Sequence, residues 1–224
     1  MASHTTTTTT TRSRRGGKSP LLLGFAAFLV LIATLFVWLS AFSVPYIRSI
    51  HYIHTRENDV KFGNSGWCAG APLNGLLTGI KCHRHVGYNF RPWIPGGKSA
   101  TGALILVALT AGFGSLAFFS LLHSATNIRS GAASFGLTLF TTLLATISFF
   151  LVVIVYGTAH RRFNHDNLDA HYGAAFVLVI LGWLIYLLTI PLIFLGWFKN
   201  RRQHTTNATI RGDSHQTTNV SIRA

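Results

Sequence analysis

Four long apolar runs dominate the pattern of hydrophobic and polar positions along the chain. They cover residues 21–44, 104–122, 135–156 and 174–198, and none of them contains Asp, Glu, Lys or Arg. A helix needs about 20 apolar residues to cross the hydrocarbon core of a bilayer. The runs are apolar on every side, whereas helices of soluble proteins show a polar face. The pattern therefore predicts an all-α membrane protein with a bundle of four transmembrane helices.

The polar segments between the runs differ in length. Residues 45–101 form the only long segment, and residues 126–131 and 157–171 form a short turn and a second loop. The long segment contains short pieces rich in β-branched and aromatic residues, separated by Gly and Asn, at residues 52–53, 60–62 and 88–90. Such pieces predict a small antiparallel β-sheet lying on the membrane surface.

Both ends of the chain are polar. Residues 1–19 hold a threonine run and a basic cluster, and residues 199–224 carry few apolar side chains. Segments with little apolar surface to bury cannot offset the entropy lost on ordering. We therefore expect two disordered tails around a single four-span membrane domain, residues 20–198.

The charge of the chain is strongly positive, with 19 Lys and Arg against 5 Asp and Glu and a net charge of +14. In a soluble protein this excess would indicate nucleic-acid binding. Here many of the basic residues flank the apolar runs, where positive charge attracts anionic lipid and sets the orientation of the helices. The pattern favours membrane lipids as partners and no nucleic acid.

An even number of spans places both termini on the same side of the membrane. Lys and Arg are most densely clustered in residues 12–18 and 199–202, directly beside the outermost spans. The two cysteines both lie in the 45–101 segment, as expected if that segment faces an oxidising compartment. We therefore predict that both termini are cytosolic and that residues 45–101 form an extracellular loop.

Cys68 and Cys82 are the only cysteines of the chain. A disulfide between them would close a loop of about 15 residues and stabilise the fold by about 3 kcal/mol in the chain-entropy model. The alternative is a metal site that also uses His83 and His85. Its Cys-x13-Cys-His-x-His spacing is unlike the closely paired ligands of zinc sites. We predict a disulfide and no metal site.

Histidines are concentrated in the two segments that we place outside the cell. Because imidazole titrates near pH 6.5, these segments would gain charge in acidic surroundings. One hypothesis is a pH-responsive surface, and the alternative is that loops simply favour polar residues. The candidate residues are His51, His54, His83, His85, His160, His165 and His171.

The sequence offers no constellation that would support catalysis. None of the five acidic residues lies inside an apolar run, and no HExxH motif occurs. A phosphate-binding loop ending at Gly97 and Lys98 would need glycine at position 92, which is Pro92. We predict that the protein is not an enzyme and binds no cofactor.

A second function class stays open, namely a small channel or transporter subunit. The apolar runs contain hydroxyl side chains that could line a pore. Such hydroxyls more often form hydrogen bonds to the backbone of their own helix. The candidates are Thr110, Thr141, Thr142, Thr146 and Ser148.

The segment from Val60 to Tyr88 carries a motif beyond its cysteines. The sequence VKFGNSGWC is followed by a second Cys and then by Gly-Tyr, and this pattern resembles the first extracellular loop of the fungal SUR7/PalI family. The four-span plan with a Trp- and Cys-marked first loop is also similar to that of claudins. The matching residues are Phe62, Gly63, Gly66, Trp67, Cys68, Cys82, Gly87 and Tyr88.

The resemblance implies a claudin-like, non-catalytic protein of the plasma membrane. PalI-like members assist a membrane sensor in ambient-pH signalling, and SUR7-like members organise plasma-membrane domains. Expected partners are therefore lipids, other membrane proteins such as a sensor or a domain-organising protein, and further copies of the chain in a homo-oligomer.

Overall fold

The computed structural model describes residues 19–56, 59–70, 81–88, 97–126 and 131–195. The predicted disordered tails lie outside the described residues, except that Ser19 already begins the first helix.

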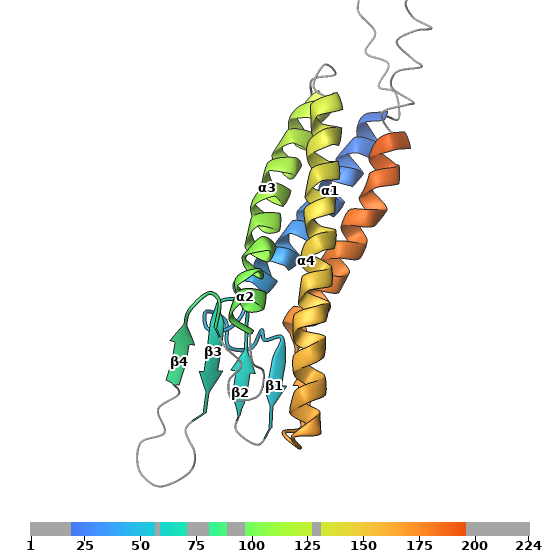
Figure 1. Cartoon of the computed structure of the whole chain (residues 1–224). Helices are drawn as coiled ribbons and strands as arrows, with labels where there is room; N and C mark the ends of the chain where they lie inside the picture. Colours follow the sequence, from blue (N-terminus) through green and yellow to red (C-terminus); the bar gives the residue numbers. More distant parts are fainter. Residues whose placement is uncertain (1–18, 57–58, 71–80, 89–96, 127–130, 196–224) are drawn as a thin grey trace, which may run out of the picture.

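Four helices in the described part of the chain are long and apolar enough to cross a membrane, which confirms the predicted spans at that level. They are α1 (Ser19–Ala41), α3 (Ile105–Thr126), α4 (Gly131–His165) and a fourth long helix, Ala174–Leu195, shown in orange in Figure 1. A short helix, α2 (Gly97–Gly102), precedes α3. The long helices form a bundle with a small sheet at one end (Figure 1).

Side-chain contacts join the helices of the bundle in pairs. α1 packs along α3, and α3 packs along α4. The fourth long helix is tied to α1 by a hydrogen bond of 2.8 Å between the hydroxyls of Tyr186 and Thr34. It is tied to α4 by the stacked rings of Trp183 and Phe149, whose centroids lie 4.1 Å apart. The bundle is therefore closed by specific contacts as well as by apolar packing.

The helix that contains the third predicted span, α4, continues for nine residues beyond residue 156, to His165. Tyr156, Ala159 and Phe163 are fully buried on the sheet side of this extension. Their spacing gives the helix an apolar stripe even where its other side is polar. α4 ends where Asn167 adopts a positive φ of 58° and the Leu168 amide bonds to the Phe163 carbonyl, an arrangement typical of helix C-termini.

The predicted antiparallel sheet is present and is larger than the sequence indicated. Its five strands lie in the order β4-β3-β2-β1-β5. The fifth strand comes from the predicted second loop, so the sheet joins both polar segments. The strands are β1 (Ile53–Thr55), β2 (Val60–Phe62), β3 (Gly66–Ala69), β4 (Lys81–Arg84) and β5 (Ala170–Tyr172).

Only Tyr88 of the predicted strand at residues 88–90 is described. Tyr88 is not part of a strand, and residues 89–90 lie outside the described residues. The side chain of Tyr88 is buried beside Phe62, where it serves the core between sheet and bundle.

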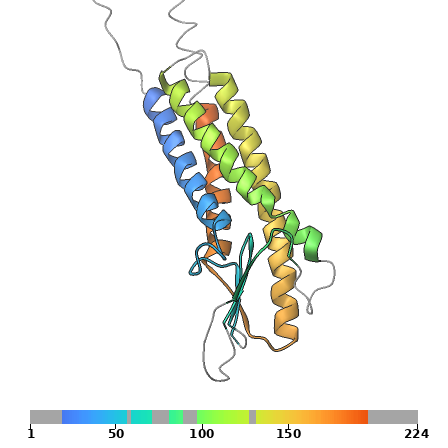
Figure 2. The ribbon, with the colours of Figure 1, turned by 90° about the vertical axis from the view of Figure 1, so that its left-hand side faces the viewer.

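One face of the sheet packs on the extension of α4. β1 and β2 bury their outer residues and leave the middle residue partly exposed, as expected for strands with one covered face. Phe62 stacks on Phe163 of α4, with ring centroids 5.5 Å apart. The edge-on view in Figure 2 shows the sheet running beside the part of α4 that extends past the bundle. We refer to strands β1–β5 together with residues 157–165 of α4 as the sheet unit.

Candidate interaction site

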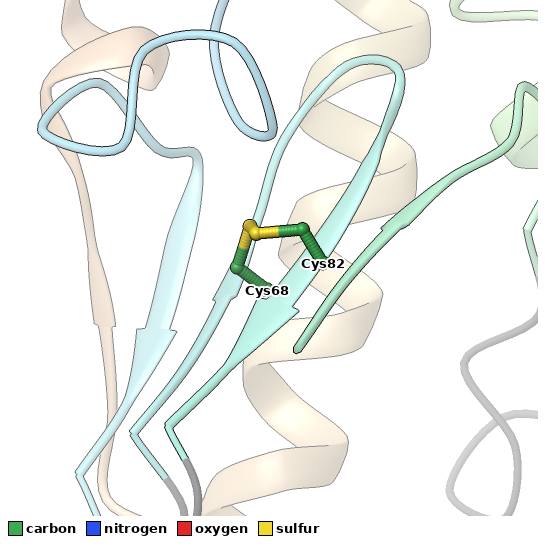
Figure 3. The surroundings of a disulfide bond; sticks show 2 residues. All are labelled: Cys68 and Cys82. Atoms are coloured by element: carbon green, nitrogen blue, oxygen red, sulfur yellow. A yellow bond between two sulfur atoms is a disulfide. The ribbon is translucent and has the colours of Figure 1, made fainter. Parts of the chain in front are cut away.

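The disulfide between Cys68 and Cys82 is formed, as predicted from the sequence. The two residues lie directly opposite each other on β3 and β4, with Cα atoms 4.1 Å apart (Figure 3). Cys68 is buried, and no described cysteine is free. Because both sulfur atoms are used in this bond, neither is a thiolate that could hold a metal ion.

Gly63 marks the point where the sheet meets the bundle. A Cβ atom at this position would lie 2.0 Å from the carbonyl oxygen of Val44, which directly follows the α1 region. Only glycine allows so close an approach of two backbone segments. The neighbouring Phe62 fills the space between sheet and helix by stacking on Tyr88 and Phe163. The Phe-Gly pair of the motif therefore has a structural role.

The carbonyl of Gly63 accepts two hydrogen bonds from tyrosines that lie far from it in the sequence. The hydroxyl of Tyr88 donates to it at 2.7 Å, and the hydroxyl of Tyr156 in α4 donates at 2.8 Å. Close by, Tyr52 stacks on Tyr156 with centroids 4.4 Å apart, and its hydroxyl is hydrogen-bonded to Ser40 of α1. We call this buried group of Ser40, Tyr52, Gly63, Tyr88 and Tyr156 the junction.

The hydroxyls of Tyr52 and Tyr88 stay protonated over the physiological range. Burial raises the pKa of both Tyr52 and Tyr88 far above the usual value for a phenol, and the contacts of these two hydroxyls with Ser40 and Tyr156 offset this only in part. A protonated hydroxyl can donate a hydrogen bond, and a phenolate cannot. The junction therefore links the sheet to the bundle at any pH that a cell tolerates.

The remaining motif residues shape the β3–β4 hairpin. Gly66 begins β3 beside the carbonyl of His83, and the Trp67 ring stacks on the imidazole of His83 with centroids 5.4 Å apart. Gly87 follows β4 with a positive φ of 78° and lies close to the carbonyl of Lys98 in α2. All of the motif residues are thus near the hairpin or the junction, and their contacts are those of packing.

Two of the predicted histidines meet where β1 pairs with β5. His54 and His171 are direct cross-strand partners, and Lys61 of β2 lies on the other side of His54. Each imidazole contacts a carboxylate: His54 lies 2.8 Å from Asp59, and His171 lies 3.2 Å from Asp169.

His51 lies beside this strand pair and is half-buried. Its Nδ1 atom is buried with no hydrogen-bond partner in the described part of the chain. Burial lowers the pKa of His51, and the nearby charges of His54 and Lys61 lower it further. The backbone of Gly173 packs against its ring, so the imidazole has little room to move.

The other predicted histidines are not brought together with these three. His83 and His85 lie at the opposite edge of the sheet, where His85 contacts the Val86 carbonyl at 2.6 Å. His160 stacks on Tyr172 with centroids 4.3 Å apart, and His165 lies 3.5 Å from Asp166 at the end of α4. The seven histidines therefore do not form one cluster. Among the described residues, no three His, Cys, Asp or Glu side chains gather closely enough to hold a metal ion.

The hydroxyls proposed as pore-lining groups are engaged within the bundle. Four of these threonines donate to the carbonyl four residues earlier, and Thr110 also bonds to Ser148 across the α3–α4 contact at 2.9 Å. Thr146 accepts a hydrogen bond from Trp183 at 3.1 Å. These contacts favour a packing role for the hydroxyls.

Several residues of the site were not identified from the sequence. Tyr156 is the last residue of the third apolar run, and Ser40 lies inside the first. Asp59 and Asp169 lie in the two polar segments. The tyrosine ending an apolar run was the one available signal, because a phenol at a membrane boundary needs a hydrogen-bond partner once buried.

Comparison with models of known protein families gives no match, and comparison with curated protein sequences gives none either.

Proposed function

We propose that this chain is a non-catalytic plasma-membrane protein of the SUR7/PalI type with a claudin-like architecture. In this role both termini lie in the cytosol, and the sheet unit contacts other membrane proteins outside the cell. The protein would organise membrane domains or assist a pH-sensing complex. The observation that supports this most is the use of the motif residues for structure: they hold a sheet whose β4 edge exposes basic and imidazole side chains.

The disulfide supports the proposed placement of the sheet unit. Structural disulfides persist in oxidising compartments and are rare in the cytosol. Cys68 and Cys82 are bonded inside the sheet, far along the chain from both termini. A sheet unit outside the cell and termini inside it are consistent with this bond and with four spans.

Of the two proposed roles, assistance to a pH-sensing complex is favoured by the β1–β5 pair. His54 and His171 face each other there, and His51 adjoins them with a lowered pKa. Protonation of His51, which burial and nearby charges oppose, would add charge where strands from two different loops meet. The alternative of a channel or transporter subunit has less support, because the hydroxyls that would line a pore are bonded within the bundle.

The proposal is tested by affinity purification from native membranes with a tag on the C-terminus. We expect stable co-purification of other membrane proteins with the wild type. The Thr142→Val variant, altered inside the bundle, should retain the same partners, and a Cys68→Ser/Cys82→Ser variant should lose them. Protease treatment of intact cells should leave the C-terminal tag uncut, and purified protein in liposomes should conduct no ions.

Three results would contradict the proposal. They are purification without any membrane partner, a C-terminal tag that is cut from outside the cell, and ion conductance that Thr142→Val or Thr146→Val changes. The last result would favour the channel alternative.

A further inference from the structure

Charge is distributed unevenly across the sheet unit. The described acidic residues in the turns beside it, Asp59, Asp166 and Asp169, each contact a basic or imidazole side chain. All of these contacts lie at β1, β5, the end of α4 or the residues next to them. At the other end of the sheet, residues 81–85 hold four exposed basic or imidazole side chains. None of the four contacts an acidic residue in the described part of the chain. They are Lys81, His83, Arg84 and His85.

β4 is an edge strand, and within the described residues it is bonded only to β3. In an antiparallel pair, residues alternate between bonding to the neighbour and directing their backbone groups away from it. The His85 amide bonds to the Ser65 carbonyl, and His83 lies opposite Trp67 in the same register. The backbone N–H and C=O groups of Cys82 and Arg84 therefore face the open side of β4, which we call the free edge.

The free edge is held in an extended conformation before any partner arrives. The disulfide joins the centre of β4 to β3, and the Trp67–His83 stack holds the opposite face of the same strand. Arg84 lies over the ring of Tyr46, with its guanidinium 5.7 Å from the ring centroid. A strand that is already ordered loses little entropy when another strand joins it.

The positive charge of the free edge determines which kind of strand can pair with it. A second copy of this chain would bring Lys81 and Arg84 against the same basic residues, and such charges on an edge oppose self-pairing. An acidic extended segment has the complementary charge. Because Lys81 and Arg84 lie on opposite faces of β4 and three positions apart, a matching segment carries two acidic residues three positions apart.

We propose that the free edge of β4 binds an extended acidic segment of a partner membrane protein, which adds to the sheet as a further strand. This inference rests on the proposed function and names the kind of partner that the sheet unit takes. Backbone hydrogen bonds from Cys82 and Arg84 supply the pairing, as in other cases of strand addition. The side chains of Lys81, His83 and Arg84 supply the preference for acidic residues.

The test uses the full chain in phosphatidylcholine nanodiscs and a fluorescent nine-residue peptide. The peptide carries two aspartates three positions apart among Val and Thr residues. Binding is followed by fluorescence anisotropy at about 0.15 M salt, where charges more than about 8 Å apart are largely screened. Lys81→Glu/Arg84→Glu should weaken binding by about tenfold or more, since it reverses two charges at the edge. Arg161→Glu/Arg162→Glu is the matched control, with the same charge change on exposed residues of α4, and should alter binding by less than about twofold.

A second pair of peptides tests strand addition itself. N-methylation of the residues whose N–H groups face β4 should abolish binding, and N-methylation of the alternate residues should preserve it. A peptide with lysines in place of the aspartates should bind the Lys81→Glu/Arg84→Glu variant better than the wild type. Thermal unfolding of each variant shows whether it is folded.

Equal losses in the two double variants would overturn the inference, because binding would then follow net charge alone. Equal binding of the two N-methylated peptides would also overturn it, as would binding of the wild type to phosphatidylserine vesicles in preference to the peptide. The proposed function stands if the peptide fails to bind while native membrane partners still co-purify with Lys81→Glu/Arg84→Glu. The proposed function fails if no native partner co-purifies with the wild type.

Discussion

The two outer strand pairs of the sheet are held together by different means. β3 and β4 belong to one loop and are joined by the Cys68–Cys82 disulfide. β1 and β5 come from segments separated by α3 and α4, and no disulfide joins them. They are held by backbone pairing and by the Arg56–Asp169 ion pair of 3.4 Å, whereas His54 and His171 contact carboxylates of their own loops.

The difference indicates a division of roles within one small sheet. The covalent link lies beside the open edge, where a strand without a second neighbour would otherwise fray. The half-buried His51, whose pKa is lowered, lies where the two loops meet and packs against Gly173. Protonation of His51 at low pH can therefore weaken the connection between the loops.

Removal of the disulfide should cause the largest loss of stability. Cys68→Ser/Cys82→Ser should lower the free energy of unfolding by about 3 kcal/mol, because the closed loop no longer restricts the unfolded chain. Hydrogen exchange should speed up most in β3 and β4, and little in β1 and β5. A reducing agent should have the same effect on the wild type and none on the variant. Uniform loss of protection across the sheet would remove the distinction between the pairs.

Gly173→Ala should have the next largest effect, at the other strand pair. The new Cβ would lie 2.1 Å from the His51 carbonyl, so β1 and the start of the fourth long helix must separate. We expect a loss of about 2 kcal/mol, with faster exchange in β1 and β5. Gly157→Ala is the control, since nothing lies within 4 Å of its Cβ position and alanine favours a helix. If both variants unfold alike, the close contact at Gly173 is unimportant.

Tyr156→Phe should lower the free energy of unfolding by a smaller amount, and both strand pairs should lose protection. The Gly63 carbonyl would lose the hydrogen bond from Tyr156 and keep the one from Tyr88. The expected cost is about 1 kcal/mol in thermal or chemical unfolding. Tyr46→Phe, at an exposed ring, should change the stability by less than about 0.5 kcal/mol. A loss confined to one strand pair would show that the junction does not serve both.

The smallest effect concerns pH. Because the pKa of His51 is lowered in the fold, the unfolded chain takes up its proton first as the pH falls. The stability from neutral His51 is therefore present above about pH 6.5 and is lost progressively below it. His51→Gln should narrow the difference in Tm between about pH 7.5 and pH 5.5. The exposed His165 provides the control variant, His165→Gln, which should leave that difference unchanged.

The spans and the disulfide were predictable for simple physical reasons. The thickness of a bilayer imposes a minimum apolar length, which each run meets without help from the rest of the fold. With only Cys68 and Cys82 in the chain, an oxidising environment leaves one pairing. Such constraints act within a short stretch of sequence or on a very small set of residues.

The rest of the fold depends on contacts between distant segments. Residues 157–165 look like a polar loop, and they are helical because Ala159 and Phe163 pack on a sheet formed elsewhere. β4 contains Lys, His and Arg, which are weak signals for a strand, and it is held by its pairing with β3. The double use of the Gly63 carbonyl requires tyrosines from two other segments. No pattern within a short stretch of the sequence indicates these contacts.

The length of α4 sets how far the sheet unit stands from the bilayer. Its 35 residues correspond to about 52 Å at 1.5 Å per residue, against a hydrocarbon core of about 30 Å. The sheet beside its far end is therefore kept within about 20 Å of the core boundary. At this height we expect the free edge of β4 to meet juxtamembrane segments of neighbours that diffuse in the same bilayer. Encounters would then be confined to two dimensions, so the local density of neighbours, rather than their concentration in bulk solution, would govern occupancy.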